Sequence, residues 1–182
     1  MSRRVNVLFA AEAIAARNAE LAKDIAISTQ DDLLVIAVLK GSFVFAADLI
    51  RALHVAGLSP EVEFLSLSSY RDQTESSGTV RIVHDIESEV AGRDVLLVDD
   101  ILESGRTLAY AKDLMAARGA RRVRTCVLLE KPNKRAVSIH ADLVGFVCPD
   151  LFVVGYGMDV AHAYRELPFV GVVEVDPDVA PH

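Results

Sequence analysis

Residues 95–108 read VLLVDDILESGRTL, and the interpretation of the whole chain starts from this stretch. Its first four residues form a continuous apolar run, which predicts a buried strand. The strand ends in two consecutive carboxylates, Asp99 and Asp100. Open α/β sheets bind their ligands outside the carboxyl ends of parallel strands. The stretch therefore predicts a ligand site at the end of a buried strand.

A short loop containing Ser104 and Gly105 follows the carboxylates, and a helix is expected to begin at about Thr107. A helix start preceded by small residues offers free backbone N–H groups and the positive end of the helix dipole, which suit a phosphate. Gly105 permits close approach of the backbone, while the hydroxyls of Ser104 and Thr107 add donors. The site thus combines acceptors for sugar hydroxyls or a metal with donors for a phosphate, as a phosphorylated sugar requires.

Strands and helices alternate with short connections on both sides of this motif. We expect strands at 33–39, 62–68, 81–84, 95–98 and 123–129, and helices at 10–28, 43–56 and 107–118. Ser42 is a candidate N-cap of the second helix, and Gly57 and Gly119 are candidate C-terminal stops. This order predicts the α/β class, with a twisted, mainly parallel sheet flanked by helices on both faces.

The last part of the chain has a different pattern. Short apolar runs, separated by Pro149 and Pro168, predict a small irregular lobe packed on the sheet; they lie at 143–147, 152–154 and 170–175. We expect one domain over residues 1–182, with a core at about 30–131 and a lobe at about 132–182 that includes the N-terminal segment.

Composition narrows the class of protein. Hydrophobic residues make up 52% of the 182 positions, ample for a buried core. Basic side chains number 19 against 26 acidic ones, a net charge of -7, whereas a broad nucleic-acid-binding face needs a basic surplus. The two cysteines, Cys126 and Cys148, make no disulfide framework, and no apolar run approaches the ~18 residues of a membrane span. We therefore expect a cytoplasmic protein that binds neither nucleic acid nor membrane.

Two other nucleotide-binding motifs are excluded because glycines that they require are absent from the chain. An acidic strand also occurs in P-loop NTPases, but the sequence GxxxxGK[ST] is absent from the chain. Gly155 and Gly157 begin like a GxGxxG motif, but position 160 is Val. The five histidines show no spacing typical of a metal site, which argues against a redox or metal protein.

Residues 95–108 resemble the phosphoribosyl pyrophosphate (PRPP) binding motif of the type I phosphoribosyltransferases. That motif has four hydrophobic residues, two acidic residues and a D-[ST]-G-x-T loop. The resemblance implies the type I phosphoribosyltransferase fold. It also implies that the loop from Glu103 to Thr107, Arg106 included, holds the 5′-phosphate, while Asp99 and Asp100 hold the ribose hydroxyls and assist the metal.

Two further segments resemble the hypoxanthine-guanine phosphoribosyltransferases in particular. In VLKGSFVFAADL, residues 38–49, the resemblance implies that the turn at Lys40 and Gly41 presents backbone amides to pyrophosphate. The polar, aperiodic loop 69–79 begins with Ser69-Tyr70, a pair that in similar enzymes closes over the active site. The physical motive is exclusion of water, which would hydrolyse a cationic sugar intermediate.

A third segment, PDLFVVGYGMDVAHAYRELPFV at residues 149–170, is the most specific match. The resemblance implies that Phe152 stacks on the purine and that the backbone of Val153 reads its Watson–Crick edge. It further implies that Asp159 takes part in Mg²⁺ coordination and that Arg165 contacts pyrophosphate.

The choice of base follows from the same resemblance. Lys131 corresponds to the lysine that donates to the exocyclic O6 of the base, which suits a 6-oxopurine and not the 6-amino group of adenine. The resemblance also makes Glu103 the base that takes the purine N7 proton, with one departure: the family usually has Asp there. The extra methylene moves the carboxylate by roughly 1.5 Å, a scale to which catalytic geometry is sensitive. Asp99 stands where many relatives have Glu, a milder change.

The expected activity is purine salvage, in which the 5-phosphoribosyl group passes from Mg²⁺-bound PRPP to N9 of hypoxanthine or guanine. A homodimer or homotetramer is expected from the resemblance. The alternative within enzymes is a xanthine- or guanine-preferring relative. A regulatory RNA-binding protein on the same fold is a rival from another class, which the acidic balance disfavours.

Overall fold

The structure is a computed structural model that describes residues 4–29, 32–69 and 80–173. Its elements in chain order are β1 Val5–Phe9, α1 Ala11–Ile27, β2 Leu33–Leu39, α2 Phe43–Val55, β3 Glu61–Ser69, β4 Val80–His84, β5 Asp94–Leu102, α3 Arg106–Ala117, β6 Arg122–Glu130, a 3-10 turn Pro132–Lys134, β7 Leu143–Val147, β8 Val153–Val154 and β9 Val170–Val173. The predicted α/β class is confirmed, and the three predicted helices agree with the observed ones to within a residue at each end.

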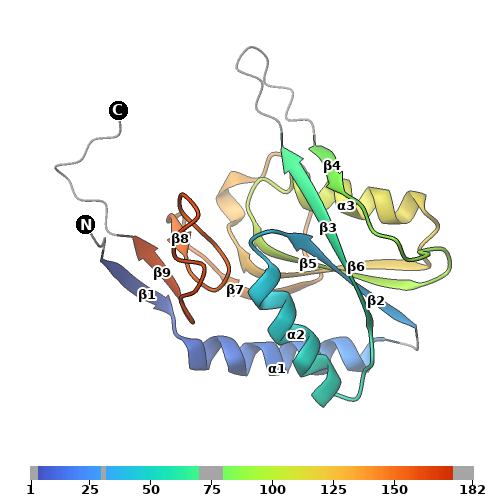
Figure 1. The fold of residues 1–182 in the computed structure, drawn as a ribbon, viewed down its shortest axis with the longest axis horizontal. Coiled ribbons are helices and arrows are strands. Elements are labelled where there is room, and N and C mark those ends of the chain that lie inside the picture. Colours follow the sequence, from blue (N-terminus) through green and yellow to red (C-terminus); the bar gives the residue numbers. More distant parts are fainter. Residues whose placement is uncertain (1–3, 30–31, 70–79, 174–182) are drawn as a thin grey trace, which may run out of the picture.

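The large sheet has the strand order β4-β3-β2-β5-β6-β7. Its strands run parallel except β4, which pairs antiparallel with β3. Helices α1 and α2 cover one face and α3 covers the other (Figure 1). Strand β2 and the first half of β5 are continuous apolar runs because central parallel strands are buried on both faces.

The core is divided by the sheet into two apolar layers. On one face, Leu21 of α1 and Phe45 and Leu49 of α2 are fully buried against the strands. On the other face, Leu108 and Met115 of α3 do the same. The helical spacing of these side chains is the feature of the sequence that predicts such covering helices.

A second, small antiparallel sheet has the order β1-β9-β8 and joins the two ends of the described chain (Figure 1). Strand β7 does not belong to it. The sequence places residues 143–147 in the tail lobe, but β7 pairs parallel with β6 as the outermost strand of the large sheet. The N-terminal strand β1 was not foreseen as a strand. It forms because β9 offers it an edge.

The structure tests three local predictions: a helix N-cap, the end of a strand and the ends of two helices. Ser42 is the N-cap residue of α2 as predicted, but its hydroxyl makes no capping hydrogen bond, because it donates to the carbonyl of Val38 at 2.5 Å. Strand β5 does not end before the carboxylates, because its pairing with β6 continues to Leu102 after its pairing with β2 has ended at Val98. Gly57 and Gly119 end α2 and α3 as predicted, with φ values of +93° and +82° that suit glycine.

None of the helices in the described ranges is long and apolar enough to cross a membrane.

Candidate active site

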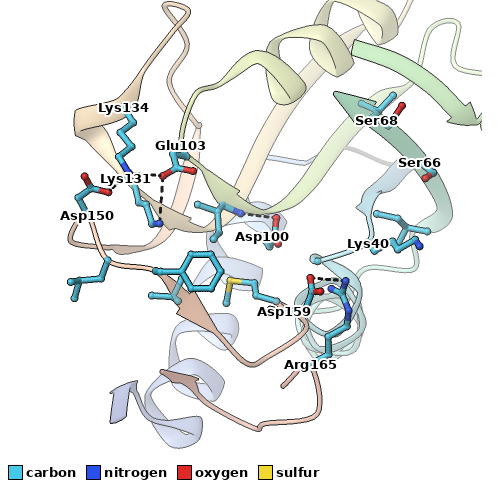
Figure 2. A pocket seen from close by; sticks show the side chains of 18 of the residues that line it. Lys40, Ser66, Ser68, Asp100, Glu103, Lys131, Lys134, Asp150, Asp159 and Arg165 are labelled. Atoms are coloured by element: carbon cyan, nitrogen blue, oxygen red, sulfur yellow. Dashed lines mark hydrogen bonds and ion pairs between the residues drawn. The ribbon is translucent and has the colours of Figure 1, made fainter. Parts of the chain in front are cut away.

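Two cavities adjoin at the carboxyl ends of β2, β3 and β5. The larger, of about 660 Å³, is lined by Lys40, Gly41, Asp100, Glu103, Lys131, Phe152, Val153, Asp159 and Arg165, among others (Figure 2). The smaller, of about 280 Å³, is lined by Asp99, Ser104, Gly105 and Thr107 and shares Lys40, Gly41, Asp100 and Glu103 with the larger. The structure thus brings together nearly all the residues that the sequence singles out. Arg106 lines neither cavity, Ser69 is the last residue of β3, and Tyr70 lies outside the described residues.

The acidic pair follows the last β2–β5 pair, Ala37 with Val98, in the part of β5 that is still paired with β6. Asp99 is only 7% exposed, and its side chain accepts a hydrogen bond from the backbone N–H of Asp100 at 2.9 Å. Burial and the neighbouring charge of Asp100 raise the pKa of Asp99 well above its usual range, and burial also raises the pKa of Asp100. Neither carboxylate has an ion-pair partner among the described side chains. The pair is therefore ready to accept hydroxyl donors or a cation.

The loop after the acidic pair is shaped by Gly105. Its φ is +81°, and a Cβ there would lie 2.5 Å from Cγ2 of Ile139, so a larger residue would be both strained and crowded. Helix α3 begins directly after it, and the Ser104 hydroxyl accepts a weak 3.4 Å hydrogen bond from the N–H of Arg106. The first-turn N–H groups of α3 consequently lie beside the smaller cavity, as an anion site requires.

The Lys40-Gly41 turn closes the opposite wall of both cavities. The Leu39–Lys40 peptide is cis. A Cβ on Gly41 would lie 1.8 Å from Oδ2 of Asp100, so only glycine allows the turn to approach the acidic pair so closely. On its other side, a Cβ on Gly157 would lie 2.3 Å from the carbonyl oxygen of Gly41. Three distant segments therefore meet at this turn, where the Gly41 backbone lies against the Asp100 side chain on one side and the Gly157 backbone on the other.

Glu103 lies at the other end of the larger cavity, between two lysines (Figure 2). Its Oε1 is 3.6 Å from Nζ of Lys131 and 3.6 Å from Nζ of Lys134. Lys134 is in turn 2.7 Å from Oδ1 of Asp150. Sequence reasoning missed Lys134 and Asp150, although the spacing KPNK after β6 and the Asp before Leu151 were visible signals.

An apolar platform borders these charges. Phe152 lines the larger cavity with a side chain that is 60% exposed, whereas the adjoining Val153 is buried in β8. An aromatic ring that stays this exposed beside a buried cation, Lys131, suits a planar ligand with one polar edge.

Asp159 and Arg165 form an ion pair of 2.7 Å at the lobe side of the larger cavity. Arg165 also donates to the carbonyl of Gly157 at 2.6 Å, and the N–H of His162 donates to Asp159 at 2.8 Å. In the part of the chain that the structure describes, no group of three or more His, Cys, Asp or Glu side chains could hold a metal by itself.

Comparison with known proteins agrees with this geometry. The phosphoribosyl transferase domain family matches residues 5–161. The chain is 44% identical over 169 residues to the hypoxanthine-guanine phosphoribosyltransferase of Bacillus subtilis, covering 92% of each chain, and 39% identical to the hypoxanthine phosphoribosyltransferase of Escherichia coli strain K12, covering 95% and 97%. A solved hypoxanthine phosphoribosyltransferase from Staphylococcus aureus superposes with a TM-score of 0.89 at 37% identity, covering 97% and 94%. The chain therefore belongs to the phosphoribosyl transferase domain family and, within it, to the hypoxanthine-guanine phosphoribosyltransferases.

Proposed function

We propose that this enzyme transfers the 5-phosphoribosyl group from PRPP to N9 of hypoxanthine or guanine, giving the nucleotide and pyrophosphate. The observation that carries the proposal is the pair of adjoining cavities. One combines buried carboxylates with a helix N-terminus, and the other combines an exposed aromatic ring with a buried lysine. The named activities of the relatives support the same reaction.

The smaller cavity holds the ribose 5-phosphate. The N–H groups at the start of α3, with the hydroxyls of Ser104 and Thr107, receive the phosphate, and Arg106 adds positive charge beside them. Asp99 and Asp100 accept hydrogen bonds from the ribose hydroxyls. Each carboxylate accepts one backbone N–H bond and has no ion-pair partner among the described residues, so its remaining acceptor capacity is available to the sugar hydroxyls.

The larger cavity holds the base and the pyrophosphate at opposite ends. Phe152 stacks on the purine, the backbone of Val153 faces its Watson–Crick edge, and Lys131 donates to O6. At the other end, the Lys40-Gly41 turn and Arg165 contact the pyrophosphate. The 6-oxo group is preferred over a 6-amino group because a buried lysine has only donors to offer.

Glu103 is the proposed general base. As pyrophosphate leaves C1′, N9 of the purine attacks from the opposite face and Glu103 takes the N7 proton, a role that needs a carboxylate within reach of the ring. The loop that begins with Ser69-Tyr70 excludes water from the cationic sugar in this proposal, as the polar composition of 69–79 suggested.

The donor set fits Mg²⁺. Asp99, Asp100 and Asp159 offer hard oxygen ligands, but they do not form a closed protein cage, which matches an ion bound through one or two carboxylates, water and substrate phosphates. When bound, Mg²⁺ neutralises charge that builds on the departing pyrophosphate. The protein groups beside it, Lys40 and Arg165, orient that leaving group.

We further propose a cytoplasmic homodimer or homotetramer. Both cysteines are free and buried, in keeping with a reducing compartment. Sedimentation of the purified chain gives the mass of the assembly; a monomer would contradict this part of the proposal.

The test is product formation from PRPP and Mg²⁺ with hypoxanthine, guanine, xanthine, adenine, orotate and uracil in parallel, resolved by chromatography. We expect turnover of hypoxanthine or guanine and none of adenine, orotate or uracil. Preferred turnover of xanthine would favour the xanthine-guanine alternative. Absence of turnover with every base, together with RNA affinity that falls steeply with salt, would favour the RNA-binding alternative. An Asp100→Asn enzyme of unchanged catalytic efficiency would contradict the ribose role.

A further inference from the structure

Two lysines compete for one oxygen of the proposed base. Nζ of Lys131 and Nζ of Lys134 each lie 3.6 Å from Oε1 of Glu103. They differ in setting, since the Lys131 side chain is 8% exposed within the cavity and the Lys134 side chain is 52% exposed at its rim. Among the described residues, Lys134 also has a second carboxylate partner, Asp150 at 2.7 Å, whereas Lys131 pairs with Glu103 alone.

The two lysines cannot keep the same roles once a base is bound. In the proposed function Lys131 turns its donors to the purine O6, and its hold on Glu103 weakens as it does so. Lys134 makes no such contact in the proposal and stays tied to Asp150 on the segment before β8. The pKa of Lys134 is raised by its hydrogen bond with Asp150 and by the charges of Asp150 and Glu103, so its ammonium stays charged there.

We propose that Lys134, anchored by Asp150, is a positioning residue for Glu103 during the reaction. This inference rests on the proposed function. Lys134 holds the carboxylate at the N7 side of the purine after Lys131 has been engaged by O6. The Lys134–Asp150 pair also suits the glutamate at position 103, where the family usually has aspartate. A glutamate reaches roughly 1.5 Å farther than an aspartate, and a misplacement on that scale costs catalysis. Lys134 lies within 3.6 Å of the longer carboxylate and fixes it.

The experiment is a double-mutant cycle read by steady-state kinetics with PRPP, Mg²⁺ and hypoxanthine. The variants are Lys134→Met, Lys134→Arg, Glu103→Asp and the combination of Glu103→Asp with Lys134→Met. Lys112→Met is the matched control, because Lys112 pairs with Asp142 at 4.0 Å on the surface away from both cavities.

We expect Lys134→Met to lower kcat about tenfold while KM for PRPP changes less than about twofold, because geometry at the base is lost and pyrophosphate binding is not. Lys134→Arg keeps most of kcat, since a cation remains. With aspartate at position 103 the carboxylate no longer reaches Lys134, so the same Lys134→Met change costs less than about threefold. The Lys112 control leaves kcat unchanged.

Two outcomes overturn the inference separately from the function. An equal loss of kcat in both backgrounds, or none in either, would show that Lys134 does not act through Glu103. Asp150→Asn with a wild-type kcat would contradict the anchoring role. If the parent enzyme turns over no base at all, the proposed function fails and this inference fails with it.

Discussion

At the scale of the single residue, Asp99 is placed where stability and function oppose each other. Its carboxylate is buried, stands beside Asp100, and has no cation partner in the described ranges. Burial first, and then the neighbouring charge, raises the pKa of Asp99 well above its ordinary value of 3.8. The folded state therefore binds this proton more tightly than the unfolded chain does.

The sign of the pH dependence follows from that shift. As the pH rises from about 4, the unfolded chain ionises at this position first, while the folded protein still holds the proton. The free energy of unfolding therefore falls with rising pH until the raised pKa of Asp99 is passed. An Asp99→Asn variant removes this loss. We expect its Tm without ligand to be a few degrees above that of the parent at pH 7–8, where ~1 kcal/mol corresponds to ~2–4 °C in a chain of this size.

The same substitution should weaken PRPP binding at least about tenfold, since in the proposed function Asp99 accepts from the ribose hydroxyls and supports Mg²⁺, and a neutral amide replaces its carboxylate. Calorimetric unfolding between pH 4 and 8 and titration with PRPP and Mg²⁺ measure the two effects. A Tm that is lowered at every pH would contradict the reading of Asp99 as a strained, functional carboxylate.

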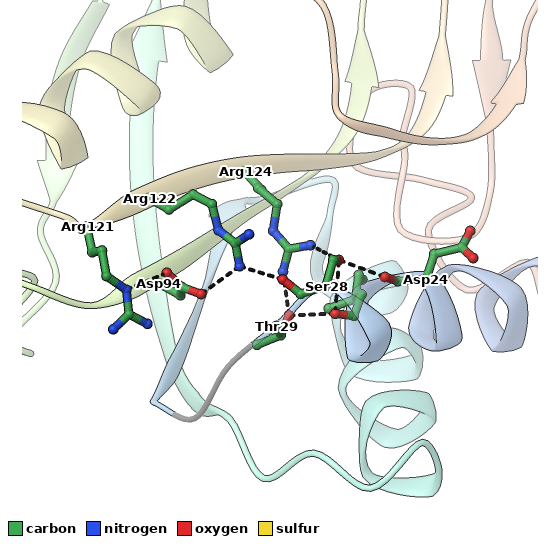
Figure 3. Close-up of polar contacts among 8 residues, drawn as sticks. Asp24, Ser28, Thr29, Asp94, Arg121, Arg122 and Arg124 are labelled. Carbon is green, nitrogen blue, oxygen red and sulfur yellow. Dashed lines mark hydrogen bonds and ion pairs between the residues drawn. The ribbon is translucent and has the colours of Figure 1, made fainter.

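At the scale of the element, α1 ends near the amino-terminal end of β6 without a basic residue in its last turn. Figure 3 shows how β6 supplies the missing charge. Arg122 donates to the carbonyl of Ser28 at 2.6 Å and pairs with buried Asp94 at 2.7 Å, while Arg124 donates to the hydroxyls of Ser28 and Thr29. Cations at a helix C-terminus are favoured by the helix dipole and by free carbonyls. These arginines therefore join helix to sheet.

We expect Arg124→Met to lower the free energy of unfolding by ~1–2 kcal/mol, the range for a partly buried cation at a helix C-terminus. Because the amino-terminal end of β6 lies opposite the cavities, which adjoin the carboxyl ends of the strands, kcat and KM should stay at the parent values. Urea unfolding with parallel assays tests both statements. A large loss of kcat with unchanged stability would mean that this cluster communicates with the active site.

At the scale of the whole molecule, the lobe docks on the sheet through glycines. Gly157 has φ +98°, and a Cβ there would lie 2.3 Å from the carbonyl of Gly41. Within the large sheet, Gly145 of β7 approaches β6 just as closely, since its Cβ would lie 2.4 Å from the carbonyl of Leu128. Around the first contact, Asn18 of α1 and Asp48 of α2 both bond the hydroxyl of Tyr156, at 2.9 and 2.5 Å. The loop that carries Asp159 is thus held against both the helices and the Lys40-Gly41 turn.

Gly157→Ala should separate these surfaces. We expect a loss of ~1–3 kcal/mol in the free energy of unfolding, from left-handed strain and crowding, and a rise of KM for PRPP by about tenfold. Gly57→Ala is the matched control, because Gly57 has φ +93° but nothing within 4 Å of its would-be Cβ. It should cost stability without altering KM. If both variants change KM alike, the docking of the lobe does not set pyrophosphate binding.

Elements whose signals are local could be predicted from the order of the amino acids alone. Apolar runs and helical spacing predict the strands and helices, glycines predict their ends, and the carboxylates, small loop and helix start of residues 95–108 predict a phosphorylated-sugar site. These features depend on neighbours a few positions away. They were therefore readable without knowing how the chain folds back on itself.

Strand pairing and side-chain contacts between distant segments depended on how the whole chain folds. The pairing of β1 with β9, the place of β7 beside β6, and the extension of β5 through Asp99 follow from edges that other strands offer or withdraw. The hydroxyl of Ser42 turned to Val38 because a buried carbonyl was available there. Lys134 and Asp150 became part of the site because the segments after β6 and β7 converge on Glu103. Such contacts satisfy buried polar groups and fill space across long chain separations, and local propensity carries no record of them.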